Sequence, residues 1–213
     1  DTFIALPGCT LAIGDKEMFE KIMATAEKAI RHFMKTGEKD TTIQEIDEPD
    51  IILWCIWALQ QYAKEISLAE CSEKYGKLID EMIDYIMKGH HPNLFLHENG
   101  LLYSNGKDQI ISWMNSTLYG RPLIPRSGYL VEFNALWYNA LKFAASLPVK
   151  SEKTGRIEKL EALAEKSGIS FKDMFLNDCG YLFDYVDGNF ADWSVRPNML
   201  FALSTEFSPL DKT

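Results

Sequence analysis

Apolar residues recur at helical spacing along most of the chain. Between residues 15 and 34 they fall every three or four positions, and Gly37 follows them, which predicts an amphipathic helix capped by Asp15. Residues 51–57 are apolar without interruption, a pattern typical of a helix that is buried on most sides. Residues 71–86 carry apolar side chains on one face and charged ones on the other, so this third helix is expected on the outside.

The helical period disappears between His90 and Tyr129. Asn99-Gly100 separates two short apolar runs there, which predicts a β-hairpin, and glycines and prolines interrupt the rest. A long irregular stretch in a compact domain is usually functional. Beyond it we expect helices over residues 130–147, 154–166 (ended by Gly168), 171–176 and 198–205, and a brief strand over residues 181–185.

The alternation of apolar and amphipathic helices predicts concentric helical layers. The sequence has no repeat of fixed period and no low-complexity linker, so residues 1–213 are interpreted as one domain. A toroid of helical hairpins needs more helices than this pattern supplies. We therefore expect the chain to be a piece of a longer polypeptide, to pack against the part beyond Thr213, and to associate with itself when isolated.

Composition and charge disfavour several classes of function. The formal net charge is -9 and the 22 Lys and Arg residues form no stripe, which disfavours nucleic-acid binding. The longest nearly unbroken apolar run, Ile51 to Leu59, is too short to span a bilayer, and no leader peptide is visible. The four cysteines lack metal-binding spacing, so free thiols in a reducing, cytoplasmic compartment are expected, with no metal and no cofactor.

Three segments mix aromatic side chains with carboxylates, amides and guanidiniums. They are residues 47–50 ahead of Trp54, residues 113–132, and residues 184–196. Sugars are bound by such mixtures, because an aromatic face packs on the C–H face of the ring while polar groups take the hydroxyls. Hairpins of helices would bring these loops to one end of a bundle. An uncharged glucan also suits an acidic protein.

Each of these residues also has a purely structural interpretation. Trp54 and Trp137 lie in apolar helices, where core packing alone explains them. A carboxylate in the first turn of a helix is favoured by the helix dipole, and this effect alone would explain Asp50 and Glu132. Arginines beside prolines can bridge carboxylates within a loop, as Arg126 and Arg196 could. These alternatives remain open on the residues alone.

Three separated stretches resemble one family. Residues 1–8, residues 113–141 with Ile124-Pro125-Arg126-Ser127-Gly128, and residues 192–203 with Asp192-Trp193-Ser194-Val195-Arg196-Pro197-Asn198 are similar to the C-terminal amylo-alpha-1,6-glucosidase module of glycogen debranching enzymes. The resemblance implies an all-α, (α/α)6 toroid of the glucoamylase type. It also implies hydrolysis of α-1,6-linked glucosyl branch stubs on glycogen, with inversion, which needs one carboxyl as acid and another as base.

The chain departs from the family pattern at the acid. The resemblance places the catalytic acid directly after Trp-Met, where this chain has Asn115, and an amide has no transferable proton. It places the base beyond Thr213, so the isolated chain is expected to be inactive. Glu132 is the candidate replacement carboxyl, with Asp50 next. We expect the remaining site residues to bind substrate: Asp50, Trp54, Trp113, Arg126, Trp137, Asp192 and Arg196.

Two other interpretations remain. Asn115 alone favours a non-catalytic module that binds glucan through a degenerate acid position. A helical scaffold without any sugar function would leave the three loop motifs unexplained. In the leading interpretation, the side chains of Trp113, Asn115, Arg126 and Glu132 meet in one pocket, together with those of Asp50 and Arg196.

Overall fold

A computed structural model describes residues 1–39, 41–43, 45–148 and 154–210. Most of these residues are helical, as the pattern predicts, and the strands are only two or three residues long. The helices are α1 Thr2–Cys9, the 3-10 helix η1 Leu11–Ile13, α2 Lys16–Thr36, α3 Asp50–Glu65, α4 Leu68–Met87, α5 Val131–Ser146, α6 Thr154–Phe175 and α7 Asn198–Ser204. The strands are β1 Phe95–Leu96, β2 Leu102–Tyr103, β3 Thr117–Leu118, β4 Arg121–Pro122, β5 Tyr129–Leu130, β6 Tyr185–Asp187 and β7 Phe190–Ala191.

The ends of the first long helix follow the predicted signals. Oδ1 of Asp15 accepts a hydrogen bond from the Met18 amide at 2.9 Å, which satisfies one of the free N–H groups of the first turn of α2. Gly37 ends α2 in the left-handed conformation, with φ of 73°. The short helix α1 and η1 carry no strong pattern and were not expected from the sequence.

The prediction that Gly168 ends a helix is wrong. Helix α6 runs without a break from Thr154 to Phe175, so the two helices expected there are one. A Cβ at position 168 would lie 2.9 Å from the ring of Tyr138 on α5. The glycine therefore allows α6 to approach α5 closely, a packing requirement that looks like a stop signal in the sequence.

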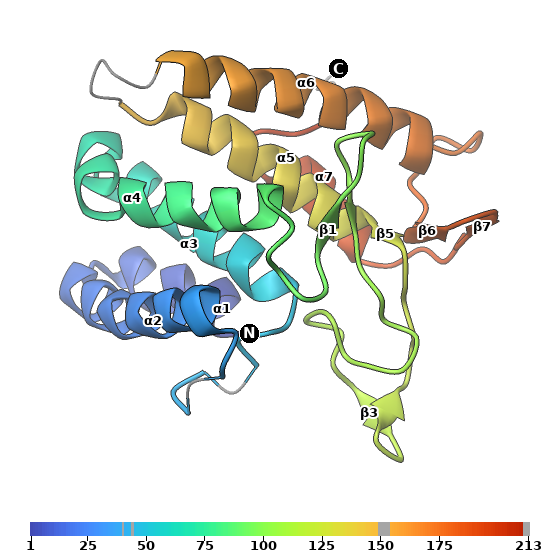
Figure 1. Cartoon of the computed structure of the whole chain (residues 1–213), viewed down its shortest axis with the longest axis horizontal. Coiled ribbons are helices and arrows are strands. Elements are labelled where there is room, and N and C mark those ends of the chain that lie inside the picture. Colours follow the sequence, from blue (N-terminus) through green and yellow to red (C-terminus); the bar gives the residue numbers. More distant parts are fainter. Residues whose placement is uncertain (40, 44, 149–153, 211–213) are drawn as a thin grey trace.

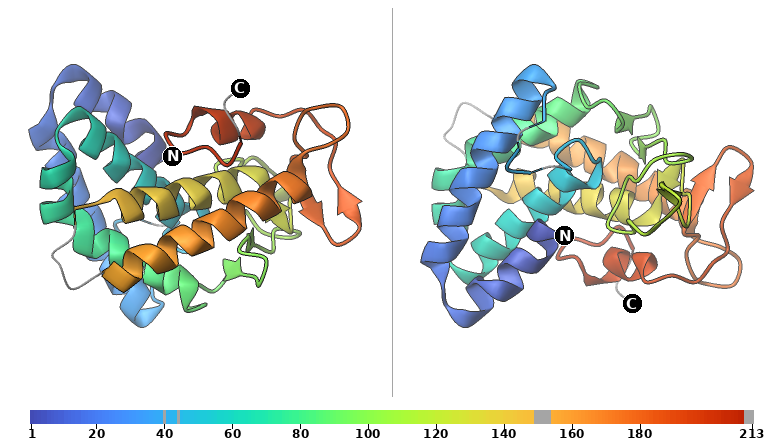
Figure 2. Two further views of the ribbon diagram at one scale, coloured as in Figure 1. Left: turned by 90° about the horizontal axis from the view of Figure 1, so that it is seen from above. Right: turned by 90° about the horizontal axis from the view of Figure 1, so that it is seen from below.

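The apolar helices form the interior. Helix α3 contacts α1, α4 and α5, and α5 also contacts α6 and α7. The amphipathic helices α2, α4 and α6 lie around them, and Figure 1 and Figure 2 show this arrangement from three sides. The expected inner and outer helical layers are therefore present. Helix α7 differs from the other apolar helices, because its side chains Leu200 and Leu203 are each 57% exposed.

Short strands connect the irregular segments. The expected hairpin is present, with Phe95 opposite Tyr103 and Gly100 at φ of 83°. The strand expected over residues 181–185 is displaced: β6 begins only at Tyr185, and it pairs with β5 on one side and β7 on the other. Because β5 leads directly into α5, this pairing holds the segment before α7 against the start of α5.

Candidate active site

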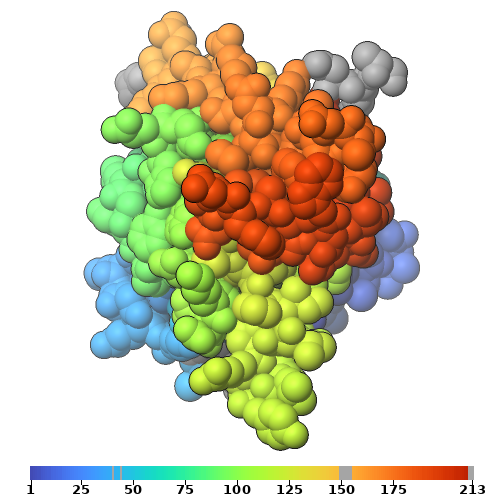
Figure 3. Space-filling view, turned by 90° about the vertical axis from the view of Figure 1, so that its right-hand side faces the viewer, coloured from blue at the N-terminus to red at the C-terminus, as the bar shows by residue number. Residues whose placement is uncertain are grey.

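The segments that precede α3, α5 and α7 meet at one end of the helical bundle (Figure 1). Figure 3 shows this end face on, with the orange and red C-terminal segment lying above the yellow-green β3–β4 hairpin. Each of the three helices starts here, so polar residues beside their first turns are brought together. The common direction of these helices is a tertiary feature that places the three loop motifs side by side.

The buried guanidinium of Arg126 links two of the motifs. It donates to both carboxylate oxygens of Glu132, with Nη2 2.6 Å from Oε2. Its Nε lies 2.7 Å from Oδ2 of Asp184, and Nη2 also donates to the Asp184 carbonyl and to Oδ1. All three side chains are at most 2% exposed. Charge-assisted, bidentate pairs of this kind fix geometry strongly, because each buried charge needs its partner.

Arg196 extends the same network towards the surface. Its Nη1 lies 2.6 Å from Oδ2 of Asp184 and 3.2 Å from Oδ2 of Asp192. Burial favours the neutral form of Asp192, but hydrogen bonds from Ser194 and Arg196 outweigh this and lower the pKa of its carboxyl. Asp192 therefore carries a negative charge that keeps the Arg196 guanidinium in place.

The other arm of the network reaches the start of α3. Nδ2 of Asn198 donates to Oδ1 of Asp184 at 2.7 Å, and Oδ1 of Asn198 accepts from the Trp113 indole N–H at 3.1 Å. The backbone N–H of Trp113 donates to Oδ2 of Asp50 at 2.8 Å. A continuous series of hydrogen bonds thus runs from Asp50 to Glu132 across the three loop motifs.

A small cavity of about 10 Å³ lies at the Asp50 end, with room for about one water molecule. Asp50, Glu48, Trp54, Trp113 and Asn115 are among the residues that line it. The indole N–H of Trp54 is buried there, and none of the residues that the structure describes accepts a hydrogen bond from it. Oδ1 of Asp50 likewise has no partner in the described part of the chain. Both groups are available to a polar ligand.

The two carboxyls of this cavity hold protons unusually strongly. Burial raises the pKa of Asp50 to about 7, and the neighbouring charge of Glu48 raises it further against the hydrogen bond from Trp113. The pKa of Glu48 is raised to about 7 by burial and by Glu45 and Asp47. Near neutral pH, a proton is therefore present in the cavity beside Asn115.

The structure does not bring every expected residue to the cavity. Trp137 is fully buried in the core, and its indole N–H donates to the Gly100 carbonyl at 3.2 Å, so the core interpretation explains it. Glu132 has no exposed surface and both its oxygens are held by Arg126, so it faces a guanidinium. Its position fits the bridging alternative for Arg126 better than an acid or base.

Two residues at the centre of the network were not among the predicted site residues. Asp184 accepts from three side chains, those of Arg126, Arg196 and Asn198, and Asn198 also holds Trp113. Asp184 stood within a motif of interest but carried no signal of its own. Asn198 follows Pro197 at a helix start, where an amide is ordinary.

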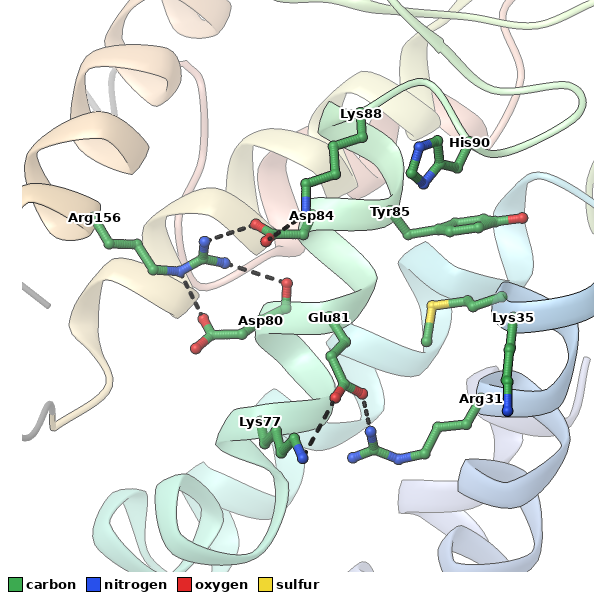
Figure 4. A pocket seen from close by; sticks show the side chains of 11 residues that line it. Arg31, Lys35, Lys77, Asp80, Glu81, Asp84, Tyr85, Lys88, His90 and Arg156 are labelled. Carbon is green, nitrogen blue, oxygen red and sulfur yellow. Dashed lines mark hydrogen bonds and ion pairs between the residues drawn. The ribbon is translucent and has the colours of Figure 1, made fainter.

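A larger groove lies elsewhere, between α2, α4 and the start of α6 (Figure 4). Its volume is about 660 Å³, and charged side chains line it. Arg31 pairs with Glu27 and Glu81, and Arg156 pairs with Asp80 and Asp84. Because these ions neutralise one another between packed helices, the groove is explained by helix packing.

The described residues offer neither a membrane-spanning helix nor a metal-binding group. None of the helices in those parts of the chain is both long and apolar enough to cross a membrane. Within the same ranges, no group of three or more His, Cys, Asp or Glu side chains could hold a metal ion. The four cysteines are unpaired thiols, with Cys55 and Cys71 buried.

Comparison with protein families decides the relationship of this chain. Residues 1–213, the whole chain, match the family described as amylo-alpha-1,6-glucosidase. The chain belongs to the amylo-alpha-1,6-glucosidase family. It is thereby related to the glycoside hydrolases of glycogen debranching. Searches of curated proteins and of solved structures gave no match.

Proposed function

We propose that this chain carries the substrate-binding part of an inverting α-1,6-glucosidase that removes glucosyl branch stubs from glycogen in the cytoplasm. In this proposal residues 1–213 form the N-terminal and central part of a single (α/α)6 toroid of the glucoamylase type. One observation supports it most: the continuous network from Asp50 to Glu132 includes four residues of the stretches that carry the family resemblance, Trp113, Arg126, Glu132 and Asn198.

The network prepares a rigid polar floor for a sugar. Buried side chains that already hold one another do not reorganise when a ligand arrives, so little entropy is lost on binding. The cavity at the Asp50 end has room for about one water molecule, so the Trp54 indole N–H and Oδ1 of Asp50 would reach a sugar hydroxyl through that water. The indole of Trp113 supplies an apolar face, fixed by its bond to Asn198.

Hydrolysis with inversion requires a proton donor and a base on opposite sides of the glycosidic bond. Asn115 has no transferable proton, and Glu132 is fully engaged by Arg126. Asp50 fits the donor best, because it shares a cavity with Asn115 and its pKa is about 7, close to working pH. The base would come from the part of the polypeptide that the resemblance places beyond Thr213, and this chain alone would then be inactive.

A second candidate function rests on Asn115 itself. If no carboxyl replaces the family acid, the same floor binds α-glucan without cleaving it. Two measurements on the full-length protein separate the candidates: retardation during electrophoresis in gels containing glycogen, and release of glucose from a branched limit dextrin. We expect both retardation and release. Retardation without release supports the binding module, and the absence of both overturns the proposed function.

A further inference from the structure

Trp193 is an aromatic residue beside the network that the proposed mechanism leaves unused. It directly follows Asp192, and 51% of its surface is exposed. A single exposed apolar side chain is ordinary on a protein surface, so exposure alone does not mark a site. What distinguishes Trp193 is the way in which neighbouring residues hold its ring.

The indole is held in a fixed orientation. The ring of Phe183 lies 4.7 Å from it, centroid to centroid, at an interplanar angle of 84°, and Tyr181 lies 6.3 Å away at 77°. The turn that carries the indole is fixed by the Ser194 amide, which donates to Oδ1 of Asp192 at 2.7 Å. A flat apolar surface is thus presented without freedom to rotate, as a stacking platform requires.

Polar donors follow this platform three residues later along the chain. Arg196 uses only Nη1 in its pairs with Asp184 and Asp192. Its Nε and Nη2 have no partner among the residues that the structure places, and 18% of its side chain is exposed. A guanidinium with unused N–H groups beside an aromatic face matches the alternating apolar and hydroxyl surfaces of a sugar ring.

We propose that Trp193 and the unused donors of Arg196 form a second glucosyl-binding position, which takes a neighbouring glucose unit of the same α-glucan chain. This inference rests on the proposed function, which takes the first unit to lie against the half-buried Trp113. A purely apolar partner surface fits less well, since charged Asp192 and Arg196 flank the indole. The position would add affinity for longer glucans.

Binding of maltose and of maltopentaose to the full-length protein tests this by titration calorimetry. Trp193→Ala should weaken maltopentaose binding roughly tenfold, the scale of one aromatic contact with its buried area. Trp193→Phe keeps a ring and should lose less than about threefold. Val195, two residues further and 74% exposed, provides Val195→Ala as a control with unchanged binding. The thermal unfolding midpoint of each variant verifies folding.

The length of the sugar separates a binding role from a structural one. Trp193→Ala should weaken maltopentaose binding much more than maltose binding. An equal loss for both sugars, or maltopentaose binding within about twofold of the parent, overturns the second position while the proposed function stands. Failure of the unaltered protein to bind either sugar overturns the proposed function and this inference together.

Discussion

Nε of Arg126 lies 2.7 Å from Oδ2 of Asp184, a residue 58 positions further along the chain. The same guanidinium donates hydrogen bonds to both carboxylate oxygens of Glu132. The contact with Asp184 joins the segment before α5 to the segment before α7. Both carboxylates are at most 1% exposed: Glu132 pairs with Arg126, and Asp184 pairs with Arg126 and Arg196. The network around Asp184 is therefore the framework of the proposed site, and the loss of one of its charges should destabilise the fold.

Removal of the Arg126 cation should be costly. Arg126→Met leaves the buried Glu132 carboxylate without its cation and leaves Asp184 with Arg196 as its remaining cation. Breaking a buried pair costs about 3–5 kcal/mol of unfolding free energy. Urea denaturation measures this loss. Arg121→Met, on the exposed strand β4, is the matched control and should stay within about 0.5 kcal/mol of the parent. A loss at position 126 as small as that at position 121 would contradict the network.

Asn115→Asp should raise or preserve debranching by the full-length protein. The substitution places a carboxyl where the family has its acid, next to Asp50 in the same cavity. Release of glucose from a branched limit dextrin measures the effect. Asn105→Asp, at an exposed position in the same irregular segment, should leave the rate unchanged. A large fall in rate for Asn115→Asp alone would show that the amide itself is required.

Glu132→Gln should reduce debranching through Arg126. The neutral amide cannot form the bidentate ionic pair, so the guanidinium loses part of its anchor and Asp184 moves with it. The predicted signature is a lower rate with little change in the pH profile, because Glu132 does not transfer the proton. A shifted pH profile would instead indicate that Glu132 is the acid or base.

Asp50→Asn should stabilise the protein selectively above neutral pH. The folded-state pKa of Asp50 is about 7 and the unfolded one is about 3.9, so the folded protein holds a proton that the unfolded chain releases between these values. Stability therefore falls as pH rises from about 4 to 7. The variant should gain up to about 4 kcal/mol at pH 8 and little at pH 4. Asp108→Asn, at an exposed position, is the control, and equal gains at both pH values would contradict the assignment.

Titration of His91 should lower the stability of the protein as the pH falls, which is opposite to the pH dependence expected from Asp50. Burial lowers the pKa of its imidazole to about 4, against a partial opposing effect of Asp47. Below about pH 6.5 the unfolded chain binds a proton at His91, whereas the folded protein does so only near pH 4. The free energy of unfolding therefore falls by about 3 kcal/mol as the pH drops from about 6.5 to 4. His91→Gln should remove this dependence. Thermal unfolding between pH 4 and 7 measures it, and a variant with the parent's acid slope would refute it.

The two mid-helix glycines should respond differently to alanine. Gly76→Ala in α4 meets only ordinary contact with Ser72, so the gain in helix propensity, up to about 1 kcal/mol, should appear as stabilisation. Gly168→Ala pushes against the Tyr138 ring and should destabilise instead. Thermal unfolding of both variants decides this, and stabilisation by Gly168→Ala would mean that α5 and α6 separate easily.

Much of the helical architecture was determined by the sequence alone. The spacing of apolar residues and the local caps act within a few residues of the chain, so α2, with Asp15 and Gly37 at its ends, and the buried character of α3 were predictable. The hairpin at Asn99-Gly100 was predictable for the same reason. The mixture of aromatic and polar residues likewise marked the three loops that meet at the site.

Tertiary structure alone decided how those residues are used. Gly168 permits close packing against a residue 30 positions earlier, which no local pattern can express. Trp137 and Glu132 were predicted as site residues. In the structure Trp137 is packed in the core and Glu132 is paired with Arg126, because burial and ion pairing depend on distant segments. Asp184 became the centre of the network only because β5 and β6 pair across some fifty residues and carry its carboxylate to Arg126. Local propensity acts over one turn, whereas these contacts exist only after the chain has packed.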